Sequence, residues 1–398
     1  MARGVFFNIP YHGHTNATFP VVRELVDRGE DITYYLTETF RPQVERAGAR
    51  FQGYRSLLET ELTAGTVGFL PARLPAESRA VIPQVLESVR ALKPDYVVYE
   101  GACMWGSFVA NLLGLPGISL RTTLVLGPHL AASRAFMQER MARFAPLLEQ
   151  ASKDVASLLS DFGLPPKSLW EMMGHVAPLN LVCVPRAFQP GGETFDARHV
   201  FVGPSIRARG DVGDFPLSRL EGGPVLYISL GTLFNAWPEF YRMCFAAFGG
   251  TPWRVVLATG NAVNVAELGP VPDNFIVRPS VPQLEVLERA SVFVTHGGAN
   301  SLMESFAYGV PVVVLPQMAE QPINAARSEE LGLGLALQKE SVTVERLREA
   351  VARVAGEPGF REKARAMQQE VHAAGGYRRA ADAILDFNAR RTAGGAPA

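Results

Sequence analysis

Short apolar runs alternate with amphipathic segments along the first half of the chain. The apolar runs at residues 5–9, 32–36 and 95–99 have the length and composition of buried strands. An amphipathic segment at residues 17–28, ended by Gly29, predicts a helix between the first two strands. Strands and helices that alternate at this spacing predict parallel βαβ units.

The same alternation begins again at Pro224 and continues through the second half. Strands are predicted in the segments LYISL, RVVLA, NFIV, SVFVT and VPVVVL, with helices between them. Residues 207–223 are charged, rich in Gly and weakly periodic, which is typical of a linker. We therefore predict a first domain at residues 1–206, a second at residues 224–376 and a last helix at residues 377–390.

Two segments have a weaker pattern. Residues 56–83 are punctuated by Pro and Gly, so we expect a mobile loop with short helical pieces there. The sequence pattern of residues 124–162 predicts mostly helix and contains an apolar stripe. For this stripe, packing in the core is favoured over contact with an acceptor. The residues of this stripe are Met137, Met141, Phe144, Leu147 and Leu148.

Composition excludes several classes of protein. A chain of 398 residues with 47% hydrophobic and 19% charged residues is globular and long enough for two domains. Lys and Arg number 38 against 39 Asp and Glu, so no broad basic field for nucleic acid is expected. Three widely spaced cysteines predict buried thiols in a reducing compartment rather than disulfides or a metal site; they are Cys103, Cys183 and Cys244.

Neither the N-terminus nor an uncharged internal window predicts a membrane or secreted protein. The first residues enter a strand at once, without room for the apolar core of a signal peptide. Residues 101–120 carry no charge over roughly a membrane-spanning length, but glycines and Pro116 divide them into a buried helix and a strand. We therefore expect no transmembrane span and a cytoplasmic location.

The segment THGGANSLMESFAYGVPVVVLPQMAEQ, residues 295–321, is the most informative part of the chain. It contains a strand end, a His-Gly-Gly turn, the start of a helix and a second strand. Asn300 and Ser301 are N-cap residue types, so the free N–H groups of the helix can face an anion. Glu304 lies four residues after Asn300, on the same face of the helix, and can accept hydrogen bonds from sugar hydroxyls. Glu320 and Gln321 follow a strand, where ligands of open α/β sheets bind.

The segment Tyr11-His12-Gly13-His14 follows the first predicted strand. An imidazole in this position is suited to general base chemistry, because its ordinary pKa of about 6.5 is close to neutral pH. A His-x-His pair also suggests a metal site, but no Asp, Glu or third His nearby completes one. A structural role for His14 as a cap of the next helix also remains open.

Several separated motifs resemble those of the family 1 glycosyltransferases, nearest to the bacterial macrolide-glycosyltransferase group. They are YHGHTNATFPVVRELVDRGEDITYY, AFQPGGETFD, FVGP, LYISLGTLFN and VPQLEVLERASVFVTHGGANSLMES. The resemblance implies the GT-B architecture, which consists of two doubly wound parallel-sheet (Rossmann-like) α/β domains facing across a cleft. It also implies that the last helix returns to the first domain, which would bind the acceptor.

The resemblance implies that His14 is the catalytic base, with His12 as the local competitor. A carboxylate usually fixes the tautomer of this base, and the matching position at the end of the fourth strand is Glu100 where the family has Asp. Glutamate keeps the charge and changes the reach. A simple solvated strand end is the alternative role for Glu100. Residues predicted to contact the acceptor are Tyr11, His12, Phe19, Met104 and Trp105. For Phe19, Met104 and Trp105, packing in the core stays open as the alternative role.

The second domain would bind the donor through its diphosphate, ribose, base and hexose. The family places phosphate contacts in the Ser-Leu-Gly-Thr turn and around His296, ribose contacts at Glu304 and hexose contacts at the Glu-Gln pair. Ser280 stands where the family carries an aromatic residue that stacks on the base, and Glu320 stands where it usually has Asp. The predicted donor residues are Ser229, Gly231, Thr232, Ser280, Val281, Gln283, His296, Gly298, Asn300, Ser301, Glu304, Glu320 and Gln321.

The resemblance predicts an inverting, metal-independent transferase that moves a hexose, glucose as the best candidate, from a UDP-sugar to a hydroxyl of a hydrophobic natural product such as a macrolide or polyphenol. The UDP-sugar is a co-substrate, and no other cofactor is expected. Two alternatives stay open. A nucleotide-sugar epimerase would need acid/base groups beside the hexose, where fewer candidates lie. A catalytically silent helper or binding protein is the second, which Ser280 mildly favours.

Overall fold

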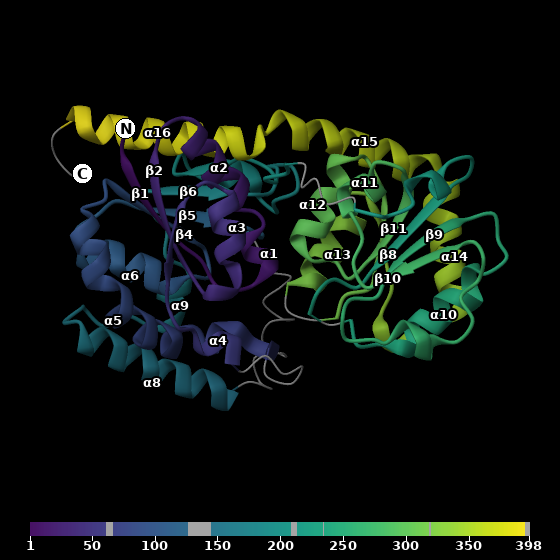
Figure 1. Cartoon of the computed structure of the whole chain (residues 1–398), viewed down its shortest axis with the longest axis horizontal. Helices are drawn as coiled ribbons and strands as arrows, with labels where there is room; N and C mark the ends of the chain where they lie inside the picture. Colours follow the sequence, from purple (N-terminus) through teal and green to yellow (C-terminus); the bar gives the residue numbers. More distant parts are fainter. Residues whose placement is uncertain (61–66, 126–144, 208–212, 234, 318–319, 395–398) are drawn as a thin grey trace. The chain divides into compact units, whose positions relative to one another are not determined.

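The computed structural model describes residues 1–60, 67–125, 145–207, 213–233, 235–317 and 320–394. The chain divides into two compact units, one of Met1–Ile206 with Ala374–Ala398 and the other of Arg207–Ala373. Each unit is built around its own parallel sheet with helices on both faces (Figure 1). The predicted fold class, two parallel-sheet α/β domains, is confirmed.

The sheet of the first unit has the strand order β3-β2-β1-β4-β5-β6-β7, and every pair is parallel. The order reverses between β1 and β4, which lie side by side with Phe7 opposite Tyr99. This is a topological switch point, where ligands of doubly wound sheets bind at the carboxyl ends of the strands. The strands are β1 (Arg3–Phe7), β2 (Asp31–Leu36), β3 (Arg50–Gly53), β4 (Tyr96–Glu100), β5 (Gly117–Arg121), β6 (Leu179–Val182) and β7 (His199–Phe201).

Two hydrophobic clusters cover the two faces of this sheet. One joins α2 to the last helix, whose Ala380 and Ile384 are fully buried. The other joins α5, α6 and α8, which contact one another below the opposite face. The helices of this unit are α1 (His12–Thr15), α2 (Phe19–Asp27), α3 (Arg41–Arg46), α4 (Leu57–Thr60), α5 (Leu74–Leu92), α6 (Met104–Leu112), α8 (Ala145–Asp161), α9 (Leu169–Met173) and α16 (Gly376–Gly394).

The sheet of the second unit has the order β10-β9-β8-β11-β12-β13, also parallel throughout. Its switch point lies between β8 and β11, with Ser229 opposite Thr295 at the carboxyl ends. The strands are β8 (Val225–Ser229), β9 (Arg254–Ala258), β10 (Phe275–Arg278), β11 (Ala290–Thr295), β12 (Val312–Val314) and β13 (Gly334–Ala336). The helices are α10 (Pro238–Phe248), α11 (Gln283–Leu287), α12 (Ala299–Ala307), α13 (Gln321–Glu330), α14 (Val344–Gly356) and α15 (Pro358–Ala373).

The expectation of a loop throughout residues 56–83 is wrong for its last part, because α5 begins at Leu74. Pro75 lies in the first turn of α5, where its missing N–H is harmless. Pro83 lies inside the helix, and its loss of one hydrogen bond is offset by a buried stripe on the same helix. The prolines masked a helical periodicity whose buried positions are Leu74, Val81, Val85 and Val89.

The apolar stripe at residues 124–162 is only partly described. Met137, Met141 and Phe144 lie outside the described residues. Leu148 packs against the core of the first unit, as predicted. Leu147 is 52% exposed, so the core assignment is wrong for this residue.

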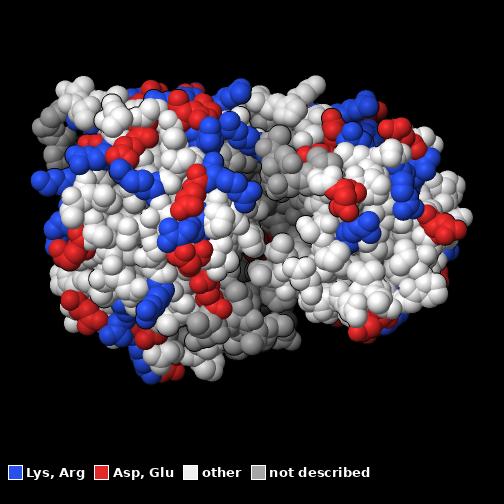
Figure 2. Space-filling view, viewed as in Figure 1, with Lys and Arg blue, Asp and Glu red and all other residues white. Residues whose placement is uncertain are grey.

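Three other expectations concern the uncharged window, the cysteines and the distribution of charge. The uncharged window 101–120 is divided between α6 and β5, and no described helix is long and apolar enough to cross a membrane. All three cysteines are free and buried. Acidic and basic side chains are interspersed over the face shown in Figure 2, without a broad field of one sign.

Candidate active site

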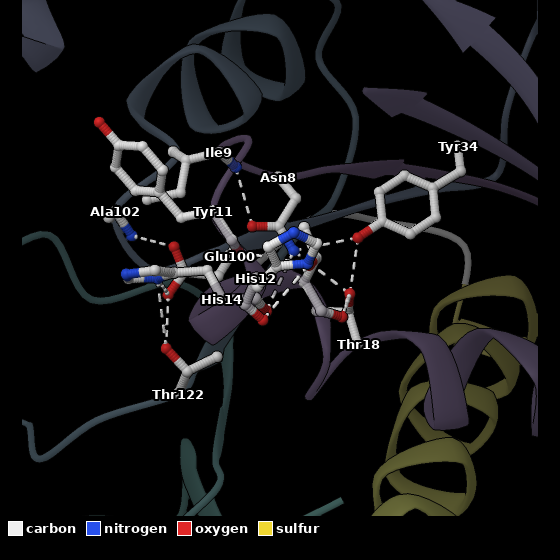
Figure 3. A network of polar contacts seen from close by, with 11 residues as sticks. Asn8, Ile9, Tyr11, His12, His14, Thr18, Tyr34, Glu100, Ala102 and Thr122 are labelled. Atoms are coloured by element: carbon white, nitrogen blue, oxygen red, sulfur yellow. Dashed lines mark hydrogen bonds and ion pairs between the residues drawn. The ribbon is translucent and has the colours of Figure 1, made fainter. Parts of the chain in front are cut away.

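The switch point of the first unit brings His14 and Glu100 together. His14 lies on α1, which begins just after β1, and Glu100 is the last residue of the adjacent strand β4. The Nδ1 atom of His14 is 3.0 Å from Oε1 of Glu100, with side-chain exposures of 24% and 3% (Figure 3). The solvated strand end considered for Glu100 is therefore wrong.

Glu100 is held by three donors. Besides His14, the hydroxyl of Thr122 donates to Oε1 at 2.9 Å and the backbone N–H of Ala102 donates to Oε2 at 2.9 Å. Burial alone would raise the pKa of Glu100, but the charge and hydrogen bond of His14, together with these two donors, hold that pKa below its ordinary value. Glu100 is thus a carboxylate at neutral pH, and the added length of Glu over Asp does not prevent contact with the imidazole.

An ionised carboxylate at Nδ1 fixes the state of the imidazole. Because a carboxylate only accepts hydrogen bonds, Nδ1 must carry the proton. The lone pair of the neutral ring then lies on Nε2, the nitrogen that can accept a proton from a substrate. This is the arrangement that a general base requires.

His12 lies in a different setting. Its ring packs 4.9 Å from that of Phe40, burial lowers its pKa, and the described residues show no carboxylate in contact with it. The ring of Tyr11 is buried, 6.3 Å from the ring of His14. Of the two candidate bases, the geometry therefore favours His14.

The turn that carries His14 is fixed by Asn8, which is fully buried. The amide nitrogen of Asn8 donates to the backbone carbonyl of His14 at 3.3 Å and to Tyr34 at 3.0 Å (Figure 3). The hydroxyl of Tyr54 donates to the backbone carbonyl of Asn8 at 2.6 Å. The N-cap of α2 is Thr18, without a side-chain capping bond, so the alternative role of His14 as a cap of that helix is wrong.

Three residues predicted to contact the acceptor pack into the core of the first unit. Phe19 lies against Tyr34 with ring centroids 5.8 Å apart. Met104 is 7% exposed, and Trp105 is fully buried with its ring edge on Tyr54. Trp105 has no exposed surface, so the prediction that it contacts the acceptor directly is wrong. Met104 and Trp105 begin α6 soon after β4, and because α6 packs on the sheet, their side chains lie in the core.

The switch point of the second unit brings Ser229, Gly231, His296 and Gly298 together. The hydroxyl of Ser229 accepts from the N–H of Gly231 at 3.3 Å. A Cβ atom on Gly231 would lie 2.6 Å from the ring of His296, and one on Gly298 would lie 2.5 Å from it. Gly231 also has a φ of 79°, which favours glycine. Both glycines thus make room for the imidazole, whereas Thr232 is exposed beside them.

His296 is neutral at physiological pH. Burial lowers its pKa to about 4, and a hydrogen bond with the backbone of Ser229 opposes this shift only in part. A neutral imidazole has a single N–H group, and the hydrogen bond with the backbone of Ser229 uses it, so the other ring nitrogen can only accept. His296 therefore adds no positive charge to the phosphate contacts predicted around it.

Positive potential in this unit comes from the start of α12. Its N-cap is Gly298, which makes no side-chain capping bond, while Asn300 and Ser301 lie inside the first turn. The expectation that these two residues cap the helix is therefore wrong. Gly298 leaves the first N–H groups of α12 without a side-chain cap, as an anion site requires.

A chain of side-chain hydrogen bonds crosses the second unit beside α12. The hydroxyl of Tyr227 is 2.8 Å from Oε1 of Gln283, and Nε2 of Gln283 is 2.5 Å from Oε2 of Glu304. The side chain of Gln283, a predicted donor residue, makes both contacts. Ser280 is exposed and Val281 half-buried just before α11.

The predicted donor residues Glu320 and Gln321 lie at the start of α13. Glu320 is the N-cap of this helix and Gln321 its first residue, 6% exposed. The side-chain oxygen of Gln321 accepts from the N–H of Gln317 at 2.8 Å. The amide of Asn324 donates to the carbonyl of Gly297 at 2.9 Å, which attaches α13 to the His-Gly-Gly turn.

Within the described ranges, no group of three or more His, Cys, Asp or Glu side chains is placed to hold a metal ion. The reading of His12 and His14 as part of a metal site thus has no third ligand there. Their rings also face different partners, Phe40 and Glu100.

Known proteins are similar to this chain in sequence and in fold. Residues 253–379 match the family described as erythromycin biosynthesis protein CIII-like, C-terminal domain. The chain is 41% identical over 390 residues to the NDP-glycosyltransferase YjiC of Bacillus licheniformis, covering 96% of each chain. The chain belongs to the family 1 glycosyltransferases.

Further comparisons of this glycosyltransferase agree. It is 33% identical to the oleandomycin glycosyltransferase of Streptomyces antibioticus, over 95% of this chain and 89% of that one. The crystal structure of CalG4, the calicheamicin glycosyltransferase, matches with a TM-score of 0.85 and 33% identity, over 98% of this chain and 99% of that one. The fold of this glycosyltransferase is GT-B.

Sequence reasoning missed two side chains of this glycosyltransferase that hold predicted site residues. Thr122 follows β5, so the rule that ligands lie beyond strand ends could have found it. Tyr227 lies in the middle of β8, where a tyrosine reads as core and gives no signal.

Proposed function

We propose that this glycosyltransferase moves a hexose, with glucose as the best candidate, from a UDP-sugar to a hydroxyl of a hydrophobic natural product, with inversion and without a metal ion. The observation that carries the proposal is the contact between His14 and the ionised, buried Glu100. It is supported by relatives whose printed names specify sugar transfer, among them an oleandomycin glycosyltransferase and an uncharacterized UDP-glucosyltransferase, YojK of Bacillus subtilis, 34% identical.

In the proposed reaction, Nε2 of His14 takes the proton of the acceptor hydroxyl as its oxygen attacks the anomeric carbon of the donor. The new C–O bond forms on the face opposite the diphosphate. The bond from the anomeric carbon to the diphosphate breaks, and its electron pair leaves with the nucleotide. A single displacement of this kind converts an α-linked donor into a β-glycoside.

The charges produced by this step have partners in the chain. Glu100 stabilises the imidazolium form of His14, because the carboxylate already accepts from Nδ1. In the second unit, the first N–H groups of α12 are the donors for the leaving diphosphate, with the neutral ring of His296 beside them. Glu304 is proposed to hold the ribose hydroxyls, and Glu320 with Gln321 those of the hexose.

Purified protein, UDP-glucose and a panel of hydrophobic acceptors test this function. We expect UDP release that requires an acceptor and that is unchanged by a chelator such as EDTA, because backbone amides rather than a metal receive the diphosphate charge. Replacing UDP-glucose with dTDP-glucose in the same assay measures the preference for the nucleotide.

The other outcomes identify the alternatives. Conversion of UDP-glucose without any acceptor would indicate an epimerase instead. Nucleotide binding without turnover across the panel would indicate a helper or binding protein. A strict requirement for added Mg²⁺ would contradict the metal-independent mechanism.

A further inference from the structure

The hydroxyl of Tyr227 has no assigned role in the proposed reaction, yet it contacts the donor machinery. Tyr227 is 1% exposed in the middle of β8 and stacks on Phe293 with ring centroids 4.4 Å apart. Its hydroxyl is 2.8 Å from Oε1 of Gln283. Gln283 in turn contacts Glu304, the residue proposed to bind the ribose.

The direction of these hydrogen bonds follows from the chemistry of Glu304. A carboxylate has no proton to donate, so the atom of Gln283 that lies 2.5 Å from it must be the amide nitrogen. If the amide were turned over, its oxygen would face the carboxylate oxygen and the two acceptors would repel. With the nitrogen towards Glu304, the amide oxygen faces Tyr227, and the phenol must donate.

The phenol thus selects one of the two amide orientations. Without its O–H group, nothing on that side would require the oxygen of Gln283, and the amide could rotate away from Glu304. Glu304 is 5% exposed, so the position of its carboxylate depends strongly on its hydrogen-bond partners. The amide nitrogen of Gln283 donates to one carboxylate oxygen, Oε2, and this hydrogen bond fixes the orientation of the carboxylate.

We propose that Tyr227 is a positioning residue that, through Gln283, orients the carboxylate of Glu304 and so sets the preference for a ribonucleotide over a 2′-deoxyribonucleotide donor. The inference rests on the proposed function, because it takes Glu304 as the acceptor for the ribose hydroxyls. A donor with a 2′-hydroxyl offers one more hydrogen bond to a correctly placed carboxylate than a deoxyribose donor does. The discrimination therefore depends on the placement of the carboxylate as well as on its presence.

Isothermal titration of the full chain with UDP and with 2′-deoxy-UDP tests this inference. For the wild-type protein we expect UDP to bind about 10-fold more tightly, as one hydrogen bond to a charged group contributes. Tyr227→Phe removes one oxygen atom and keeps the stacking on Phe293. It should weaken UDP binding about 5- to 10-fold, leave 2′-deoxy-UDP binding within about two-fold, and raise the donor KM without a matching loss of kcat.

Tyr96→Phe is the matched control. Tyr96 is fully buried in the first unit, and its hydroxyl also donates to one side chain, Glu30, at 3.1 Å. We expect this variant to keep the wild-type preference for UDP even where its thermal stability falls. A second variant, Gln283→Glu, places two carboxylates in contact and should lose the preference for UDP as Tyr227→Phe does.

The outcomes separate the inference from the function on which it rests. Equal affinity of the wild-type protein for UDP and 2′-deoxy-UDP would overturn both the ribose role of Glu304 and the inference. A wild-type preference that persists unchanged in Tyr227→Phe would overturn the inference alone. A loss of preference in Tyr96→Phe as large as in Tyr227→Phe would show a general effect of stability and would also overturn it.

Discussion

His14→Ala is expected to lower the rate of glycosyl transfer by about 10²- to 10⁴-fold, the range that a positioned general base contributes. The acceptor hydroxyl loses the group that takes its proton, while no donor residue in the second unit changes. UDP affinity should therefore stay within about two-fold of the wild-type value. Initial rates with a saturating acceptor and titration with UDP measure the two effects separately.

His12→Ala is the comparison for this prediction, because it removes the neighbouring imidazole from the same short helix. We expect a loss of less than about 10-fold, since His12 contacts Phe40 and its described surroundings hold no carboxylate for it. A wild-type rate in His14→Ala would refute the assignment of the base. A larger loss in His12→Ala than in His14→Ala would transfer that role to His12.

Glu100→Gln is expected to lower kcat/KM about 100-fold with little change in the fold. The amide keeps the size of the side chain, and its one oxygen can still accept from Thr122 at the position of Oε1, while the N–H of Ala102 loses its acceptor. The substitution removes the negative charge that stabilises the imidazolium form of His14. Steady-state kinetics together with thermal unfolding separate the loss of catalysis from a loss of stability.

The pH profile adds an independent test of Glu100. An imidazole that loses a neighbouring negative charge becomes less basic, so the acid limb of kcat/KM in Glu100→Gln should move to lower pH. Glu100→Asp keeps the charge but shortens the side chain by one methylene, so its rate should lie between those of the wild type and Glu100→Gln. An unshifted profile with a wild-type rate in Glu100→Gln would show that Glu100 plays no part in the reaction.

Apolar runs predicted the strands β1, β2, β4 and β5 of the first sheet and β8, β9, β10, β11 and β12 of the second. The sequence pattern did not predict β3, β6, β7 or β13, which are short strands at or next to a sheet edge. It also failed at α5, where Pro75 and Pro83 hid a helical pattern that buried contacts sustain. Helix propensity is a weak preference, and packing against the sheet overrides it. Residues at the ends of strands could be assigned to the site from the sequence, because the topology of the sheet places β1 beside β4. The residues that follow or end these strands, His14 and Glu100, are therefore brought into contact.

The chemistry of single side chains was less predictable. That His296 is neutral depends on burial between Gly231 and Gly298, which only the folded chain creates. Trp105 was expected at a ligand and lies wholly in the core, because the direction of a side chain after a strand depends on the helix that covers it. The contact of Tyr227 with Gln283 joins residues 56 positions apart and leaves no pattern in the sequence.

The central claim is that the imidazole of His14 receives the proton of the acceptor while the diphosphate leaves toward α12. The most direct measurement is a crystal structure of the wild-type protein with UDP and an acceptor that the activity assay has identified. We predict the reactive acceptor oxygen at about 2.6–3.2 Å from Nε2 of His14, with diphosphate oxygens on the first N–H groups of α12. An acceptor oxygen beyond hydrogen-bond reach of Nε2, or a diphosphate bound away from α12, would contradict the account.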